Sequence, residues 1–404
     1  MKLRFGEFVA LIAVLMSCQA LAVDAMLPAL GAIVSDLGIV DANRAQWVIS
    51  VYVAGVGAGQ LFWGILSDRY GRRPVLMAGL VAYGIAAALC ASATTLSELL
   101  AWRALHGVAA ASIVVARSVI RDLYEGRQMA RVMSLTFIVF LLVPMLAPAV
   151  GQLILQVGDW RVLFFFFTLF AVATGAWMVL RLPETLHPEY RMTLTPAHVL
   201  AAVRRVLLDR ASLWYTIAMA MTFGSILAYV GMVQQIFQDV YQRAGIMPMA
   251  FGISAGVMAL GSFTNSRIVE RYGMRRVSQG GLAVFIALTA VHTATAAQGD
   301  EPLWLFVALQ SLTMASMGLM GANFGAMALE EMAEIAGVAA SLQGCISSIG
   351  GALIGALIGL FFVDSVLPLP LGALLCGLGV LGCVLVAEGG RLWHPHTPDA
   401  SASA

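Results

Sequence analysis

Charged side chains are scarce in this sequence. Only 11% of its 404 residues are Asp, Glu, Lys or Arg, and 60% are hydrophobic, whereas soluble domains are roughly 25% charged. A water-soluble globule of this composition would lack the polar side chains needed to cover its surface, so lipid must supply part of the contact. The composition therefore excludes an ordinary soluble domain and predicts a protein that lies in a lipid bilayer; the length of its apolar segments, about 20 residues, predicts an all-α membrane protein.

Lysine is almost absent, since every basic side chain except Lys2 is an arginine. A phosphate-binding Walker loop needs Gly-Lys-Ser/Thr, so the chain cannot hold one, and transport driven by ATP bound within it is excluded. The formal net charge of +1 gives no electrostatic reason to expect a nucleic-acid partner.

Metal-binding and disulfide patterns are also missing. The cysteines are odd in number, form no Cys-x-x-Cys pair and all lie in apolar runs, which is typical of small residues in a membrane core. The histidines form no His-Glu-x-x-His helix, and His394 and His396 sit in a polar tail where a solvated terminus is expected. We predict neither a metal nor a cofactor.

The N-terminus resembles a targeting signal. Lys2 and Arg4 precede an apolar run that ends at Ala20-Leu21-Ala22, and Leu15-Met16-Ser17-Cys18 resembles a lipoprotein cleavage box. Cleavage at either place would remove the first helix. Because the rest of the chain is as hydrophobic as its start, we expect an uncleaved first transmembrane span.

Apolar segments long enough to cross a bilayer make up most of the chain, since a transmembrane helix needs about 20 such residues. We predict twelve transmembrane helices in two bundles of six, at 8–30, 46–66, 74–93, 97–118, 129–152, 162–181, 212–236, 249–268, 277–297, 302–326, 336–361 and 367–388. The corresponding divisions are an N-terminal bundle at 1–186, a cytoplasmic linker at 187–211, a C-terminal bundle at 212–390 and a polar tail at 391–404. The linker pattern predicts either an interfacial amphipathic helix or a flexible connection.

Arginine is distributed unevenly over the connections between these segments. One alternate set of connections carries only Arg44, Arg161 and Arg243, and the other set carries all the remaining basic residues near the spans. Basic residues are retained on the cytoplasmic side, so we predict that both termini are cytoplasmic.

A repeated motif follows the second and eighth segments. The first copy runs from Gly64 to Pro74 and the second from Glu270 to Arg276, and the acids Asp68 and Glu270 are 270 − 68 = 202 residues apart, half the chain length. This repeat predicts two equivalent bundles that enclose a cavity. Charge pairs where the two bundles meet can stabilise one closed conformation. The alternative is that these arginines only reflect the general retention of basic residues in cytoplasmic loops, but this explains neither the acidic residue nor its repetition in the second half. The candidate gating residues are Gly64, Asp68, Arg69, Gly71, Arg72, Arg73, Glu270, Arg271 and Gly273.

The repeated motif resembles the signature loop of the major facilitator superfamily, and the resemblance covers essentially the whole chain. Other segments are similar to the Bcr/CflA branch of drug/proton antiporters: residues 24–30, Tyr52, Gln60, residues 117–123, residues 147–151, Trp160-Arg161 and residues 182–186. The resemblance implies a major facilitator fold and a monomeric multidrug efflux transporter in the bacterial inner membrane. Its partners would be protons and an amphiphilic, drug-like small molecule, with antibiotic resistance as the consequence.

Two other functions fit the same sequence. Proton-coupled uptake of a metabolite uses the same fold and stays open. A membrane-embedded enzyme or receptor is a remote alternative, because no second carboxylate, histidine pair or activated nucleophile lies at the depth of Asp24. We therefore predict that the protein is not an enzyme.

Asp24 is the principal candidate for the site, because a carboxylate within a span costs about 2.5 to 3.5 kcal/mol and persists mainly where it faces a cavity. Burial disfavours its charged form and a nearby cation favours it, so opening the cavity to either side could change its proton occupancy. Arg103 is its expected partner. Each residue lies 6 positions from the outer end of its span, which places both about 9 Å deep.

The resemblance extends to Arg103, which in the family belongs to an Arg-x-x-Gln-Gly motif implicated in proton coupling. Here His106 stands at the position of the glutamine. Histidine titrates near neutrality and could join a proton relay; the alternative is a neutral histidine that only forms a hydrogen bond within the bundle.

The fifth segment holds Pro144, Pro148 and Gly151, which favour a kink and close packing. Related antiporters carry Gly-Pro-x-x-Gly-Gly in this region, and here Ala147 and Gln152 replace two of its glycines. Antiport remains the leading interpretation. Polar or amphipathic residues that could line a drug cavity, or else form interhelical hydrogen bonds, are Tyr52, Tyr229, Gln234, Asn323 and Gln343.

Overall fold

The structure, a computed structural model, describes residues 4–124, 126–186, 189, 196–332 and 335–393. Within these ranges the regular structure consists only of helices. This is the result expected for a chain in a bilayer, where each backbone N–H and C=O must find a partner within its own segment. The predicted all-α fold class is confirmed.

The N-terminal half forms the first bundle. Its first span begins with α1 (Phe5–Asp24) and resumes, after a short 3₁₀ turn at Leu27–Ala29, as α2 (Leu30–Asp36). The other helices are α3 (Trp47–Tyr70), α4 (Arg72–Ala91), α5 (Leu96–Ala110), α6 (Val115–Leu123), α7 (Gly126–Ile154) and α8 (Arg161–Arg181). α5 and α6 are joined by a 3₁₀ turn and together make one span.

The C-terminal half forms the second bundle. Its helices are α10 (Arg210–Gln235), which continues as the π-helix η5 (Ile236–Val240), then α11 (Met247–Tyr272), α12 (Met274–Ala296), α13 (Leu303–Ala328), α14 (Ala336–Gly359) and α15 (Pro368–Ala387). Between the halves, α9 (Pro196–Leu208) occupies part of the predicted linker. Positions 187–188 and 190–195 of that linker, and the tail from 394 onward, lie outside the described residues.

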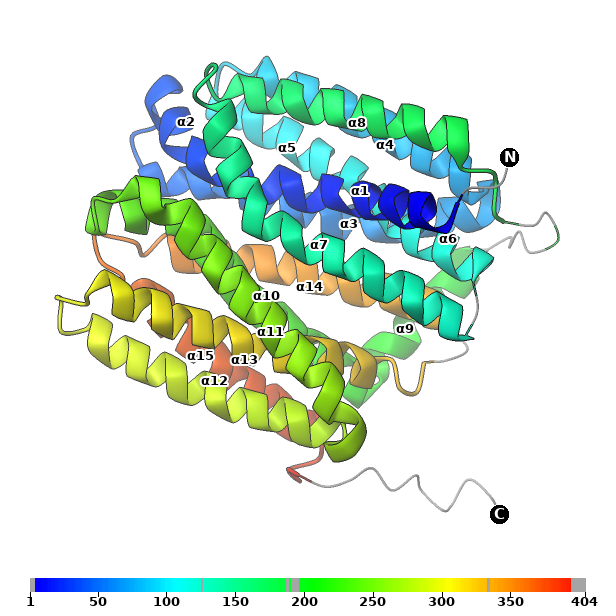
Figure 1. The fold of residues 1–404 in the computed structure, drawn as a ribbon. Coiled ribbons are helices and arrows are strands. Elements are labelled where there is room, and N and C mark those ends of the chain that lie inside the picture. The colour runs from blue at the N-terminus through cyan, green and yellow to red at the C-terminus, as the bar shows by residue number, and fades with distance from the viewer. Residues whose placement is uncertain (1–3, 125, 187–188, 190–195, 333–334, 394–404) are drawn as a thin grey trace.

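Eleven helical segments of the described chain are long and apolar enough to cross a membrane. The remaining predicted span, 129–152, falls within α7, whose 29 residues also suffice for a crossing. Figure 1 shows the two bundles one above the other, with α6, α9 and the start of α1 at one end of the molecule and α2 at the other. α3 packs against α14 and α7 against α11, so these helices form the contact between bundles.

The two repeated loops have the same backbone form. α3 ends at Gly71 with φ of 103°, and α11 ends at Gly273 with φ of 81°. Positive φ is readily adopted only by glycine. The sequence repeat therefore corresponds to a repeated helix–turn–helix in the two bundles.

Candidate functional site

Asp24 is the last residue of α1, immediately before the break in the first span. Pro28 lies in the 3₁₀ turn after it and has no backbone N–H to continue an α-helix. The side chain of Asp24 is in the interior, with only 6% of the residue exposed. The break thus carries a carboxylate into the core at a place where the regular hydrogen bonding of the helix is interrupted.

Arg103 lies on α5 and is completely buried, at 0% exposure. Its guanidinium donates from Nε to the carbonyl of Val48 at 3.0 Å and from one terminal nitrogen to the carbonyl of Ala22 at 3.1 Å. Its Cζ lies 4.2 Å from the ring centroid of Tyr52. Carbonyl dipoles and an aromatic face thus stabilise this buried charge, and the contacts join α5 to α1 and α3.

The expected direct pair between Asp24 and Arg103 is not among the ion pairs of the described residues. Arg103 instead reaches the first span at the carbonyl of Ala22, two positions before Asp24. The two residues therefore share one region of the N-terminal bundle without a direct bond. A small movement at the break in the span would change the distance between the carboxylate and the guanidinium.

His106 lies one helical turn after Arg103 and is also fully buried. Its Nδ1 is 3.2 Å from a terminal nitrogen of Arg103; because arginine can only donate, Nδ1 must accept and the ring proton belongs on Nε2. A protonated ring would place two cations in contact. The geometry favours a neutral histidine that holds Arg103 in place, packed 4.1 Å from the ring of Tyr83.

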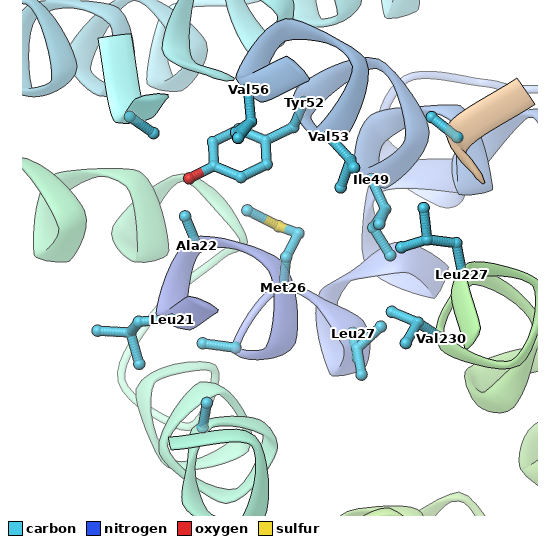
Figure 2. Close-up of a cluster of buried hydrophobic side chains, with 14 of the residues drawn as sticks. Leu21, Ala22, Met26, Leu27, Ile49, Tyr52, Val53, Val56, Leu227 and Val230 are labelled. Atoms are coloured by element: carbon cyan, nitrogen blue, oxygen red, sulfur yellow. The ribbon is translucent and has the colours of Figure 1, made fainter. Parts of the chain in front are cut away.

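The break in the first span also lies where the bundles meet. Figure 2 shows Leu27 directed toward Val230 and Leu227 of α10, with Met26 and Tyr52 on the other side. All of these side chains are buried. Movement of the C-terminal bundle against the N-terminal bundle would therefore displace Leu27, which is only three residues after Asp24.

The predicted motif of the fifth segment, Pro144, Pro148 and Gly151, lies on α7 and explains how this helix approaches the break in the first span. α7 runs through Pro144 and Pro148 without ending, and Gly151 places its backbone against the break in the first span. A Cβ atom at Gly151 would lie 2.1 Å from the carbonyl oxygen of Ala25. Only glycine permits this contact, so the motif positions the segment that follows Asp24.

We expect Gly151→Ala to lower stability by about 1 to 3 kcal/mol, because the added methyl must push α7 away from Ala25. Transport activity should fall as well. The matched control is Gly382→Ala on α15, where an added Cβ meets nothing within 4 Å. Thermal unfolding of the purified variants checks this; equal melting temperatures for the two variants would contradict the packing argument.

The predicted cavity residues are all buried and bonded between helices or within them. Tyr52 donates to the carbonyl of Gln19 at 3.2 Å, Tyr229 to Ser254 at 3.3 Å and Gln343 to the carbonyl of Gly325 at 3.3 Å. Asn323 donates to Asn265 at 2.8 Å, and Gln234 to Gln238 at 3.3 Å. In this conformation their hydrogen bonds hold the bundles in shape, and an apolar groove between α7 and α11 contains none of them.

At the end of the molecule that holds α6 and α9, a cluster of charged side chains, which we call a charge ring, closes the N-terminal bundle. Arg72 pairs with Asp68 and, at 3.0 Å, with Asp122 of α6. Glu184 accepts from the backbone N–H groups of Arg72 at 2.9 Å and Arg73 at 3.2 Å, as expected for a carboxylate at the start of a helix. Sequence reasoning missed Glu184 as a cap, although it stands in the similar segment 182–186.

The C-terminal bundle has a corresponding ring. Arg275 pairs with Glu330 at 3.0 Å and with Glu388 at 2.8 Å, and Tyr215 donates to Glu388 at 2.5 Å. The predicted gating residues Glu270 and Arg271 are exposed instead. In the described part of the chain, each charge ring makes contacts only within its own bundle. The guanidinium of Arg69 likewise contacts its neighbour Tyr70, over whose ring it lies.

The opposite end of the molecule carries a set of hydrogen bonds between bundles. Asn43 donates to the carbonyl of Phe362 at 2.9 Å, Gln235 donates to Asn43 at 2.9 Å, and Gln46 donates to Gln235. We call Asn43, Gln46, Gln235 and Phe362 the outer clasp. Among the described residues it contains all the hydrogen bonds that join the two bundles directly, and its amides carried no signal in the sequence.

This architecture can be compared with known proteins. A sequence profile of the Major Facilitator Superfamily matches residues 12–355. The chain belongs to the major facilitator superfamily. As a member of this superfamily it is a multi-pass membrane transporter rather than an enzyme, and it acts on small molecules.

Relatives within the superfamily match over most of their length. The chain is 31% identical over 353 residues to multidrug resistance protein MdtL of Klebsiella pneumoniae, covering 84% of this chain and 85% of the relative. It is 27% identical over 370 residues to a bicyclomycin resistance protein homolog of Haemophilus influenzae, covering 90% and 91%. A solved D-xylose-proton symporter superposes with a TM-score of 0.73 over 97% of this chain and 99% of its own, at 16% identity, a likeness of fold alone.

Proposed function

We propose that this transporter exports drug-like or toxic amphiphilic small molecules across the bacterial inner membrane in exchange for protons. The names of the relatives, multidrug resistance and bicyclomycin resistance, support the direction and the class of substrate. The single observation that carries the proton role is Asp24, a carboxylate buried at the break of the first span. Leu27 of the same break lies against α10 of the other bundle (Figure 2). A buried acid of this kind can exchange its proton as its surroundings change.

Arg103 and His106 have supporting roles in this proposal. The guanidinium is fixed by the carbonyls of Ala22 and Val48, and His106 fixes its third nitrogen. When the break moves, the approach of this fixed charge would favour the ionised form of Asp24 and release its proton. His106 positions Arg103 and is not itself the proton carrier.

The two ends of the molecule fit alternating access by a monomer whose bundles rock against each other. We place the termini and the charge rings at Asp68 and Arg275 on the cytoplasmic side, where the arginines are retained. The outer clasp then faces the periplasm and is closed in this conformation. In the other conformation the clasp opens and the repeated loops, from Gly64 to Arg73 and from Glu270 to Gly273, close the cytoplasmic seam.

Expression in an efflux-deficient host with a panel of antibiotics tests the direction and the substrate class. Export predicts raised resistance to at least one amphiphilic compound and lower accumulation of it in the cells. Unchanged resistance to every compound, together with proton-driven accumulation of a metabolite, would instead establish uptake by symport.

For the outer clasp, we expect Gln235→Ala to shift the protein toward the conformation that is open to the periplasm. The substitution removes hydrogen bonds to Asn43 and Gln46. Each contributes about 1 kcal/mol, so the population ratio should change roughly thirtyfold. Gln298→Ala, at an exposed residue between α12 and α13, is the control. Distances between spin labels on the outer ends of the bundles measure the shift, and identical distributions in the two variants would exclude a latching role.

A further inference from the structure

A second buried titratable group lies in the C-terminal bundle, far along the chain from Asp24. His292 is in the last turns of α12 and Glu301 is in the connection to α13. The side chains are 1% and 2% exposed, and the imidazole Nε2 lies 3.3 Å from a carboxylate oxygen of Glu301. Charged groups are almost never this buried unless they are paired. This burial therefore indicates that His292 and Glu301 act as a pair.

The surroundings hold the pair in a fixed position. Thr295 donates to the other carboxylate oxygen of Glu301 at 2.9 Å. The centroid of the Phe306 ring on α13 lies 5.6 Å from that of His292 and 5.7 Å from that of Tyr241. Tyr241 follows η5, so side chains from α12, α13 and the end of α10 meet here.

Hydrogen bonding in this cluster is incomplete. The hydroxyl of Tyr241, Nε2 of His292 and one carboxylate oxygen of Glu301 are buried and have no hydrogen-bond partner among the described residues. Leaving such groups unsatisfied costs about 1 to 3 kcal/mol each. If the pair binds a proton, Nε2 of His292 can donate a charge-assisted hydrogen bond to the Glu301 carboxylate. Two of the three unsatisfied groups would then have a partner.

Few other charges can influence the pair. Burial, aided by the nearby Glu301 carboxylate, raises the pKa of Tyr241, which keeps its hydroxyl protonated. The nearby charged residues on the packed connections, all exposed, are Asp239, Arg243 and Asp300. α13 and α15, which pack against α12, contain no Asp, Glu, Lys, Arg or His. α11, which also contacts α12, carries charge only from Arg267 onward, at the end away from His292.

We propose that His292 and Glu301 form a second proton-binding site, separate from Asp24, which controls the outer clasp through the ring contacts of Phe306 with His292 and with Tyr241. With the proton bound, the ion pair fixes the end of α12 to the α12–α13 connection. Without it, the Glu301 carboxylate is buried with no cation and the cluster loosens. η5 begins directly after Gln235 of the clasp and leads to Tyr241, and π-helices are frequent at functional sites. A cluster fixed by the bound proton would hold η5, and with it Gln235, in the closed position. Proton binding would therefore stabilise the closed clasp. The periplasmic location of the site rests on the proposed function; its existence does not.

Nitrogen NMR of histidine-labelled protein in lipid nanodiscs tests the site without any substrate. His292→Asn identifies the resonance of His292. At a fixed pH of about 6, we expect Glu301→Gln to reduce the protonated fraction of this imidazole roughly threefold or more relative to the wild type, because the substitution removes the carboxylate charge that faces Nε2. Asp300→Asn, on the exposed neighbour of Glu301, should leave the spectrum unchanged. A neutral imidazole at every pH between about 5 and 8 overturns the proposal, and this result needs only the wild-type spectrum if Glu301→Gln does not fold.

Spin-label distances across the outer clasp test the control of closure. They are measured in an Asp24→Asn background, so that a failure of the proposed proton role of Asp24 does not affect the result. We expect the closed population to fall severalfold when the pH is raised from about 5.5 to about 8, and this dependence to disappear in His292→Asn. The same pH dependence with and without His292 would contradict the proposal.

Discussion

Replacement of Asp24 by asparagine should reduce drug resistance in the efflux-deficient host to the level of cells without the transporter. Asparagine keeps the size of the side chain but cannot release a proton, so the exchange of proton and substrate has no carrier. Because the carboxylate is buried and lies outside the described ion pairs, its removal should leave the fold intact. Substrate binding to purified Asp24→Asn should remain measurable and should lose most of its dependence on pH.

The control for this experiment is Asp159→Asn. Asp159 has an exposed side chain just before α8 and accepts a hydrogen bond from the backbone N–H of Arg161 at 3.0 Å. The amide oxygen of asparagine can accept the same bond, so transport should be unchanged. Full resistance with unaltered pH dependence in Asp24→Asn would show that the proton is carried elsewhere.

Replacement of Arg103 by lysine should lower the transport rate by at least about tenfold while the positive charge is retained. The guanidinium bonds to the carbonyls of Ala22 and Val48 and to His106 from three different nitrogens. A lysine amine is a single point and cannot make all three bonds, and each buried group left unsatisfied costs about 1 to 3 kcal/mol, where 1.4 kcal/mol is a factor of ten. Uptake into proteoliposomes measures the rate.

Arg204→Lys is the matched control, since Arg204 is exposed on α9. It should transport normally. If Arg103→Lys also transported normally, charge alone would be sufficient at this position, and the network of carbonyl bonds would have no functional part.

The fold could be predicted from the sequence because its physical cause is local. Long apolar segments must be helical in lipid, and the repeat of Asp68 and Glu270 at half the chain length implies two equivalent bundles. Asp24 could be recognised from local sequence as well, because it is a single acidic residue within an apolar segment. The close approach at Gly151 followed a recognisable motif, but its contact with Ala25 needed the structure.

The remaining features depend on contacts between residues far apart in the chain. Asn43, Gln46 and Gln235 are ordinary polar residues near span ends, and only the packing of the two bundles joins them into a clasp. Equal depth predicted that Arg103 lies near Asp24. Depth alone does not give the rotation of a side chain about the helix axis, and the guanidinium bonds to the carbonyl of Ala22 rather than to Asp24. Glu301 lies in a predicted connection, so its burial beside His292 had no signal in hydropathy.

The most direct test of the account is transport by purified protein in proteoliposomes with an imposed pH gradient. Using an amphiphilic substrate identified by the resistance panel, substrate movement and internal pH are recorded together. Proton-coupled export predicts that a proton gradient drives the substrate in the opposite direction, that substrate added alone moves protons the other way, and that Asp24→Asn abolishes both movements. Substrate and protons moving in the same direction, or substrate transport that is independent of the gradient, would contradict it.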